Sequence, residues 1–242
     1  MTIRGYALIV RRMGVLGLVV AAVAVTAAVA LAAQSPKALR NSIAAAARGQ
    51  HSVHWQGTDV VGGARLTSSA DVTADEGTQN VTFYLGKTTA RISIRVIDHT
   101  AYVNGDALGL RLNLGLTNAQ SSQYAGQWIS IPKTDKLYAG TAEADTLGSL
   151  VTSIVPRGRV SAFSAKVHGL QVVGVRSIHG TGKKKTLQTL DARAQGKRLP
   201  IEEDEVTPGM RVVSRTVLSR WNEAVHVTAP ANAVPITTVV GH

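Results

Sequence analysis

From residue 51 onward the sequence consists largely of short segments in which apolar residues occupy every second position, and this pattern restricts the possible folds most. Val53 and Trp55 begin the first such segment, and Ile92 and Ile94 lie in a later one. Alternation with a period of two is typical of strands that bury one face. Turn sequences rich in Gly, Asp and Lys separate the segments, so residues 51–103 predict a meander of five short antiparallel strands.

The same pattern returns in the second half of the chain. Strand-like segments lie at residues 128–132, 160–168, 171–178, 186–192, 199–206 and 210–218. No strand alternates regularly with a helix, as it would in a parallel α/β fold. About ten strands with two or three helices predict an α+β fold, in which a large antiparallel sheet curls around helices as a half barrel.

Three segments of the same region predict helices. Ser35 followed by Pro36 is typical of a helix start, and apolar residues continue at helical spacing from there. A second amphipathic pattern covers residues 147–154 and stops at a proline. The polar segment 117–124 is compatible with a helix, and the tail 229–242 is expected to be ordered at its start and loose at its end.

The first 33 residues have the features of a targeting segment. Arg4, Arg11 and Arg12 precede residues 13–33, a run of 21 residues without a charge. A helix of this length, at about 1.5 Å per residue, reaches across a bilayer. Arginines on its N-terminal side predict that the rest of the chain lies outside the cytoplasm.

Two fates of this segment remain open. It is either retained as a membrane anchor or cleaved near Ala32, because Ala30-Leu31-Ala32 matches the small-x-small cleavage pattern. No linker rich in Gly, Ser or Pro divides the remainder, so residues 1–33 are read as a signal or anchor segment and residues 34–242 as one domain.

The chain contains no cysteine, which excludes disulfides, thiolate metal sites and cysteine nucleophiles. Leu31-Ala32-Ala33-Gln34 is similar to a bacterial lipobox in which Gln34 replaces the lipidated cysteine, so no thioether lipid anchor can form there. The 26 basic and 15 acidic residues give a net charge of +11, which favours contact with acidic surfaces. Aromatic residues make up only 4% of the chain, which argues against a stacking platform for nucleic acid.

The order of elements and several short phrases resemble the LppX/LprAFG group of actinobacterial (mycobacterial) lipoproteins and the wider Lol-type lipoprotein-carrier fold. The phrases are His51-Ser52-Val53-His54, Ala70-Asp71-Val72, Gly126-Gln127-Trp128-Ile129, Leu199-Pro200-Ile201, Leu218-Ser219-Arg220-Trp221 and Val225-His226-Val227-Thr228-Ala229-Pro230. The resemblance runs from about residue 36 to residue 234 and departs from the lipoprotein pattern at Gln34.

This resemblance implies a strongly curved open sheet with helices on its concave side and an apolar cavity between them that receives acyl chains or a lipoglycan. The apolar face of the predicted meander would line that cavity. Its residues are Val53, Trp55, Phe83, Leu85, Ile92, Ile94 and Val103. The alternative is that these side chains form an ordinary closed core, because an apolar strand face is usually core.

The sequence contains no arrangement that predicts catalysis or a bound metal or other cofactor. It has no Gly-x-Ser-x-Gly motif and no zinc-type histidine spacing. The acidic run 202–205 reads as a solvated sheet edge. Lys183, Lys184 and Lys185 are candidates for contact with an anionic membrane surface, with a solvated hairpin tip as the alternative.

Together these features predict a non-enzymatic lipid-binding or carrier protein of the cell envelope, located outside the cytoplasm. A structural or interaction module with the same fold, a filled core and no ligand is the alternative. The volume enclosed between the sheet and the helices would separate the two.

Overall fold

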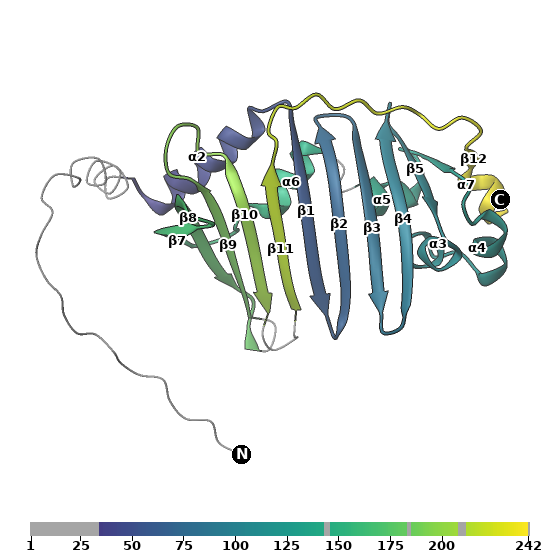
Figure 1. Cartoon of the computed structure of the whole chain (residues 1–242), viewed down its shortest axis with the longest axis horizontal. Coiled ribbons are helices and arrows are strands. Elements are labelled where there is room, and N and C mark those ends of the chain that lie inside the picture. The colour runs from purple at the N-terminus through teal and green to yellow at the C-terminus, as the bar shows by residue number, and fades with distance from the viewer. Residues whose placement is uncertain (1–33, 143–145, 183–184, 208–211, 242) are drawn as a thin grey trace, which may run out of the picture. The chain divides into compact units, whose positions relative to one another are not determined.

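The strands of the computed structural model form one sheet in the order β12-β6-β5-β4-β3-β2-β1-β11-β10-β9-β8-β7 (Figure 1). The structure describes residues 34–142, 146–182, 185–207 and 212–241. The predicted signal or anchor segment, residues 1–33, lies outside this part of the chain. Within the described part, no helix is long and apolar enough to cross a membrane.

The first half of the sheet is the meander that the alternation predicted. Each strand pairs antiparallel with the next one in sequence. The strands are β1 (Ser52–Val61), β2 (Ala64–Thr73), β3 (Gly77–Leu85), β4 (Thr88–Ile97), β5 (Thr100–Gly105) and β6 (Ile129–Pro132).

The second half of the sheet is also antiparallel, and its last strand pairs with β1. Its strands are β7 (Val160–Val167), β8 (Leu170–His179), β9 (Thr186–Arg193), β10 (Pro200–Thr207) and β11 (Val212–Ser219). The short β12 (Val234–Pro235) joins β6 in parallel at the other end of the sheet. The α+β class and the strongly curved open sheet are thus confirmed, with this parallel pair as an addition.

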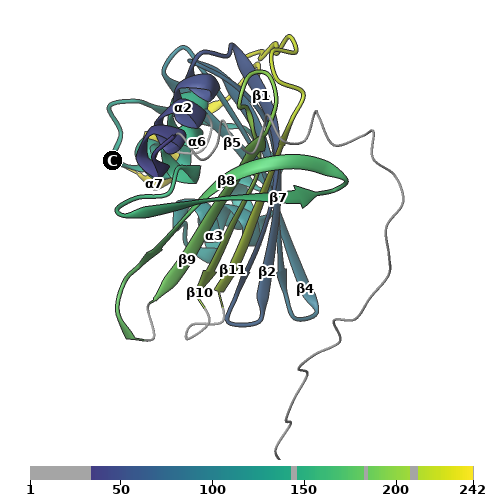
Figure 2. The same cartoon turned by 90° about the vertical axis from the view of Figure 1, so that its left-hand side faces the viewer.

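The helices lie on one face of the curled sheet, which we call the concave face (Figure 2). They are α2 (Pro36–Arg48), α3 (Ala107–Leu114), α4 (Asn118–Tyr124), α5 (Lys136–Ala142), α6 (Leu147–Ile154) and α7 (Ile236–Val240). The sequence predicted α2, α4 and α6, and each begins after a serine or threonine whose side chain accepts a hydrogen bond from the first turn. It did not predict α3, α5 or α7.

The segment after β11 runs along one edge of the sheet toward β6 (Figure 1). We call residues 220–233 the C-terminal strap. Asn222 N–H donates to the carbonyl of Ser52 at 3.0 Å, and Arg95 Nη1 donates to the carbonyl of Thr228 at 2.9 Å. The strap leads into β12 and α7, where Ile236 is fully buried. The expectation of a loose tail was wrong, because the apolar side chains of α7 complete the core.

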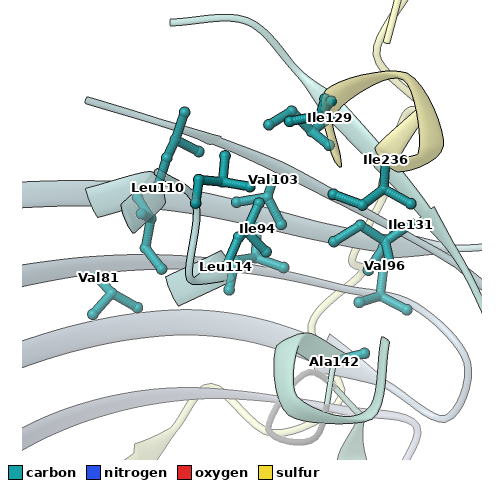
Figure 3. Close-up of a cluster of buried hydrophobic side chains, with 14 residues drawn as sticks. Val81, Ile94, Val96, Val103, Leu110, Leu114, Ile129, Ile131, Ala142 and Ile236 are labelled. Atoms are coloured by element: carbon teal, nitrogen blue, oxygen red, sulfur yellow. The ribbon is translucent and has the colours of Figure 1, made fainter. Parts of the chain in front are cut away.

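The main hydrophobic core lies between the concave face of β3–β6 and helices α3, α5 and α7 (Figure 3). Ile94 and Val103 face each other across β4 and β5, and Leu110 and Leu114 of α3 belong to the same buried cluster. Burying one such side chain contributes about 1.5–3 kcal/mol. This core fixes α3 on the sheet.

The acidic run 202–205 does not form a solvated sheet edge, which corrects the expectation from the sequence. It lies in β10, an inner strand between β9 and β11. Glu202 and Glu203 are both buried, on opposite faces of the sheet. Strand alternation places them there, and each is held by polar partners described below.

Candidate functional site

A cavity of about 670 Å³ lies between the concave face of the sheet and the helices that cover it. One wall consists of side chains from β1–β4 and β11, and the opposite wall comes from α3, α5 and α6. The apolar lining residues are Trp55, Leu66, Val81, Phe83, Ile92, Ile94 and Leu150. This volume falls in the range of about 300–1,000 Å³ that small-molecule sites have.

The register of the strands arranges the sheet wall in rows. One row contains Trp55, Ala70, Gln79 and Ile94, which are successive cross-strand partners. Further along the strands, Asp59, Leu66 and Phe83 are partners in the same way. The cavity therefore extends along the strands from the first row to the second.

Polar residues line the other parts of the cavity. The lining includes Ser149, Thr152 and Ser153 of α6, Thr141 of α5 and Arg157, which follows α6. Asp59 on β1 supplies a carboxylate to the same space. The lining thus combines apolar side chains, most of them on the sheet, with polar ones on both walls, a distribution that suits an amphiphilic molecule better than a pure hydrocarbon.

Two polar atoms of the lining are buried without a hydrogen-bond partner among the described residues. They are Nε1 of Trp55, a donor, and Oδ1 of Asn113 on α3, an acceptor. A buried polar group without a partner costs about 1–3 kcal/mol. Both atoms are themselves covered, so a side-chain movement of Trp55 or Asn113 is needed before a molecule in the cavity can bind them.

A buried carboxyl group lies beside the cavity on β10. Glu203 is the cross-strand partner of the lining residue Thr216, and Gln188 Nε2 donates to Glu203 Oε1 at 3.0 Å. Burial raises the pKa of Glu203 to about 7, and the nearby carboxylates of Glu205 and Asp59 add to the rise, while the hydrogen bond from Gln188 opposes it. This group changes charge near neutral pH.

The opposite, convex face of the same strands carries an ionic cluster. Arg215 Nη2 lies 2.6 Å from Glu202 Oε1, and His168 Nε2 lies 3.0 Å from Glu202 Oε2. Burial alone would raise the pKa of Glu202, but the hydrogen bonds from Arg215 and His168 outweigh it and hold the pKa below its usual value. Among the described residues no group of three or more His, Asp or Glu side chains is arranged to hold a metal ion.

Beside this cluster, Asp191 is buried and its Oδ1 has no partner in the described part of the chain. Burial raises the pKa of Asp191 to about 6, and the negative charges of Glu202 and Asp204 contribute to the rise. The cluster lies on the face of the sheet that does not line the cavity, and its ion pairs join β10, β11 and the β7–β8 turn.

Comparison with solved structures decides the fold. LprF from Mycobacterium bovis superposes with a TM-score of 0.54 at 16% sequence identity, over 81% of this chain and 97% of that one. The chain has the LprF fold. The Mycobacterium tuberculosis lipoprotein LppX has a TM-score of 0.48 at 15% identity, over 80% of this chain and 98% of that one. No protein-family model and no curated protein matches the sequence.

Within this LprF fold, four of the seven residues predicted to form the cavity line it, namely Trp55, Phe83, Ile92 and Ile94. The other three lie elsewhere. Val103 is completely buried in the main core, Val53 is buried nearer the start of β1, and Leu85 is exposed at the end of β3.

Sequence reasoning missed the residues that α3, α5 and α6 contribute to the cavity. Asn113 belongs to α3, whose short sequence has no strong helical periodicity, and the lining residues of α6 are small polar ones that look like a solvated face. The capping residue Asp106 was the available signal for α3, because its side chain accepts the N–H of Gly109 at 2.7 Å.

Of the three lysines proposed for membrane contact, Lys183 and Lys184 lie outside the described residues. Lys185 is exposed and directly precedes β9.

Proposed function

We propose that this protein binds a lipid in the cavity beneath its helices and serves as a non-enzymatic lipid-binding or carrier protein of the cell envelope. The observation that carries the proposal is the cavity of about 670 Å³ with seven apolar lining residues, six of them on the sheet. An acyl chain gains about 0.8 kcal/mol for each methylene group it buries. A chain of ordinary length therefore binds without many specific polar contacts.

The LprF fold supports this proposal together with the resemblance of the sequence to the LppX/LprAFG lipoproteins. The lipoprotein resemblance implies acyl chains or a lipoglycan as the cargo. The missing cysteine at Gln34 means that this chain is not itself lipid-anchored through a thioether. The charge distribution of residues 1–33 supports a location outside the cytoplasm, with this segment either retained as the anchor or removed near Ala32.

The polar atoms of the cavity favour a lipid that carries a hydrogen-bonding group close to its chain. Trp55 Nε1 can donate to such a group, and Asn113 Oδ1 can accept from it. A hydroxyl group satisfies both requirements, because it is a donor and an acceptor at once. An acyl chain with a hydroxyl or a glycolipid with a sugar hydroxyl fits this description.

Binding of a fluorescent fatty acid to residues 34–242 tests the proposal. Leu66 lines the cavity and is only partly buried, so Leu66→Trp fills space that the ligand needs. Leu170 is 55% exposed at the start of β8 and is not among the cavity-lining residues, so Leu170→Trp is the matched control. We expect saturable binding by the wild type and the control and at least a tenfold weaker affinity in Leu66→Trp.

The proposal fails if the wild-type protein shows no saturable binding of the fatty acid. It also fails if Leu66→Trp binds as tightly as the wild type, because the ligand then occupies another place. Either result would favour the alternative of an interaction module whose cavity holds no lipid.

A further inference from the structure

The exposed apolar side chains of this protein are concentrated at one edge of the sheet. Seven large apolar side chains are exposed in the described part of the chain. Five of them, Tyr84, Leu85, Ile178, Leu187 and Val213, lie within two residues of the strand ends that meet the β3–β4, β8–β9 and β10–β11 turns. The other two, Leu112 and Leu170, lie elsewhere. The ends of β1–β4 and β8–β11 that border these turns and the β1–β2 turn lie along the lower edge in Figure 1, which we call the hairpin edge.

The strand register connects most of these side chains into a continuous row. Successive cross-strand partners from β8 to β3 are Ile178, Leu187, Val206, Val213, Val60, Arg65 and Tyr84. Seven strands at about 4.8 Å spacing give a row on the order of 30 Å long. All seven lie on the convex face, opposite the cavity lining, because each is a sequence neighbour of a residue that faces the concave side.

Positive charge accompanies this row. Arg65 belongs to it and places its guanidinium 5.1 Å from the ring centre of Tyr84. Lys87 in the β3–β4 turn and Lys185 beside β9 are exposed at the same edge. The row itself contains no carboxylate, and Asp59, which neighbours Val60, lines the cavity on the other face. An apolar row flanked by cations is complementary to an anionic lipid surface.

The other edge of the sheet differs. The C-terminal strap crosses the opposite ends of the strands, where it is held by the hydrogen bonds of Asn222 to Ser52 and of Arg95 to Thr228. The hairpin edge is also the one that the cavity approaches. Leu66 and Phe83 line the cavity, and each is the direct sequence neighbour of a residue in the row.

We propose that the hairpin edge is the surface by which this protein docks onto an anionic bilayer, with its apolar row in the interfacial region and its basic residues on the headgroups. The length of the row favours a bilayer over a protein partner. A bilayer surface can contact the whole row at once, whereas a protein partner would need a groove about as long as the row. Tyrosine and arginine are residues that favour this interface. In this arrangement the cavity-lining residues Leu66 and Phe83 are direct sequence neighbours of Arg65 and Tyr84, which contact the membrane.

The test measures co-flotation of residues 34–242 with vesicles of phosphatidylcholine alone or with 30% phosphatidylglycerol. Ile178→Asp places a carboxylate in the row at a side chain that is 59% exposed. Leu170→Asp is the matched control, since Leu170 is 55% exposed at the other end of the same strand, β8. We expect the wild type and Leu170→Asp to float with the anionic vesicles, and Ile178→Asp to bind at least fivefold less.

Charge gives a second readout. Lys87→Glu reverses an exposed cation of the hairpin edge, so it should weaken binding to the anionic vesicles and leave the small binding to neutral vesicles unchanged. Absence of wild-type binding to anionic vesicles would overturn the proposal, as would an equal loss in Ile178→Asp and Leu170→Asp. Fatty-acid binding measured on the same variants keeps the two proposals apart, because Ile178→Asp should retain it.

Discussion

Gln188 Nε2 donates a hydrogen bond to Glu203 Oε1 at 3.0 Å and another to the carbonyl of Ser153 at 3.2 Å. The amide thereby joins β9, β10 and the end of α6 at the side of the cavity. The carboxyl group of Glu203 is buried there with a pKa raised to about 7. Gln188 thus connects the end of α6 to a carboxyl group that titrates near neutral pH.

The titration of Glu203 predicts how stability varies with pH. The folded-state pKa of Glu203 lies above its ordinary value of 4.5, so the folded protein binds the proton more tightly. The resulting stabilisation is complete below about pH 4.5 and is lost as the pH rises through about 7. We expect Glu203→Gln to be more stable than the wild type at pH 8, on the order of 3 kcal/mol at most. Urea unfolding at pH 5 and pH 8 measures the stability difference between Glu203→Gln and the wild type. Glu223→Gln, at an exposed position, is the control. An equal effect of Glu203→Gln at both pH values would refute this prediction.

The ionic cluster on the convex face predicts the opposite change of stability with pH. Glu202 has a lowered pKa in the folded state because Arg215 and His168 donate to it, so its contribution is present above its ordinary value of 4.5 and is lost as the pH falls. Arg215→Gln removes the partner of a buried carboxylate and should cost about 1–3 kcal/mol at pH 7. The cost should shrink toward pH 4. Thermal unfolding across this range checks the result, and a cost that grows on acidification would contradict it.

Close packing of α3 on β4 predicts the effect of a single methyl group. A Cβ at Gly109 would collide with the backbone carbonyl oxygen of Arg91 and lie 2.8 Å from Cγ2 of Ile92. Gly109→Ala should therefore displace α3 and cost about 1–3 kcal/mol or more. Gly148 in α6 has open space where its Cβ would be, so Gly148→Ala is the control and should cost nothing. Calorimetric unfolding of both variants measures the two losses of stability. Equal stabilities of Gly109→Ala and Gly148→Ala would show that α3 is not packed in this way.

Because Oδ1 of Asn113 has no partner among the described residues, replacing Asn113 should raise stability but lower the affinity for a hydroxylated ligand. In the lipid-free protein, Asn113→Leu removes a buried acceptor without a partner and should raise stability by about 1–3 kcal/mol. The same variant should lose affinity for a hydroxylated fatty acid and keep its affinity for the unsubstituted one. Unfolding and competition binding measure the two effects. A parallel loss of affinity for both fatty acids would assign Asn113 a purely structural role.

The parts of the fold that the sequence predicted are those determined by local pattern. Alternation and turn residues specify the meander β1–β5, and a capped apolar stripe specifies α2. Helix α7 shows the limit. All five of its residues are β-branched and it has no side-chain cap, so only the burial of Ile236 and Val239 in the core explains its formation.

The cavity could be predicted only in part, because it also depends on tertiary packing that no local pattern specifies. Alternation correctly placed Ile94 and Val103 on one face of the sheet, but it could not tell which of them a helix covers. Leu110 and Leu114 of α3 pack in the same cluster as Val103, whereas Ile94 belongs to that cluster and also borders the cavity (Figure 3). The empty volume depends on the distance between the sheet and α6, which no local sequence pattern encodes.

Native mass spectrometry of residues 34–242, exported to a bacterial periplasm and purified without detergent, tests lipid binding most directly. The account predicts a species heavier than the polypeptide by the mass of one lipid, which organic extraction removes and which Leu66→Trp lacks. A single species at the polypeptide mass, unchanged after incubation with lipid vesicles, would contradict it.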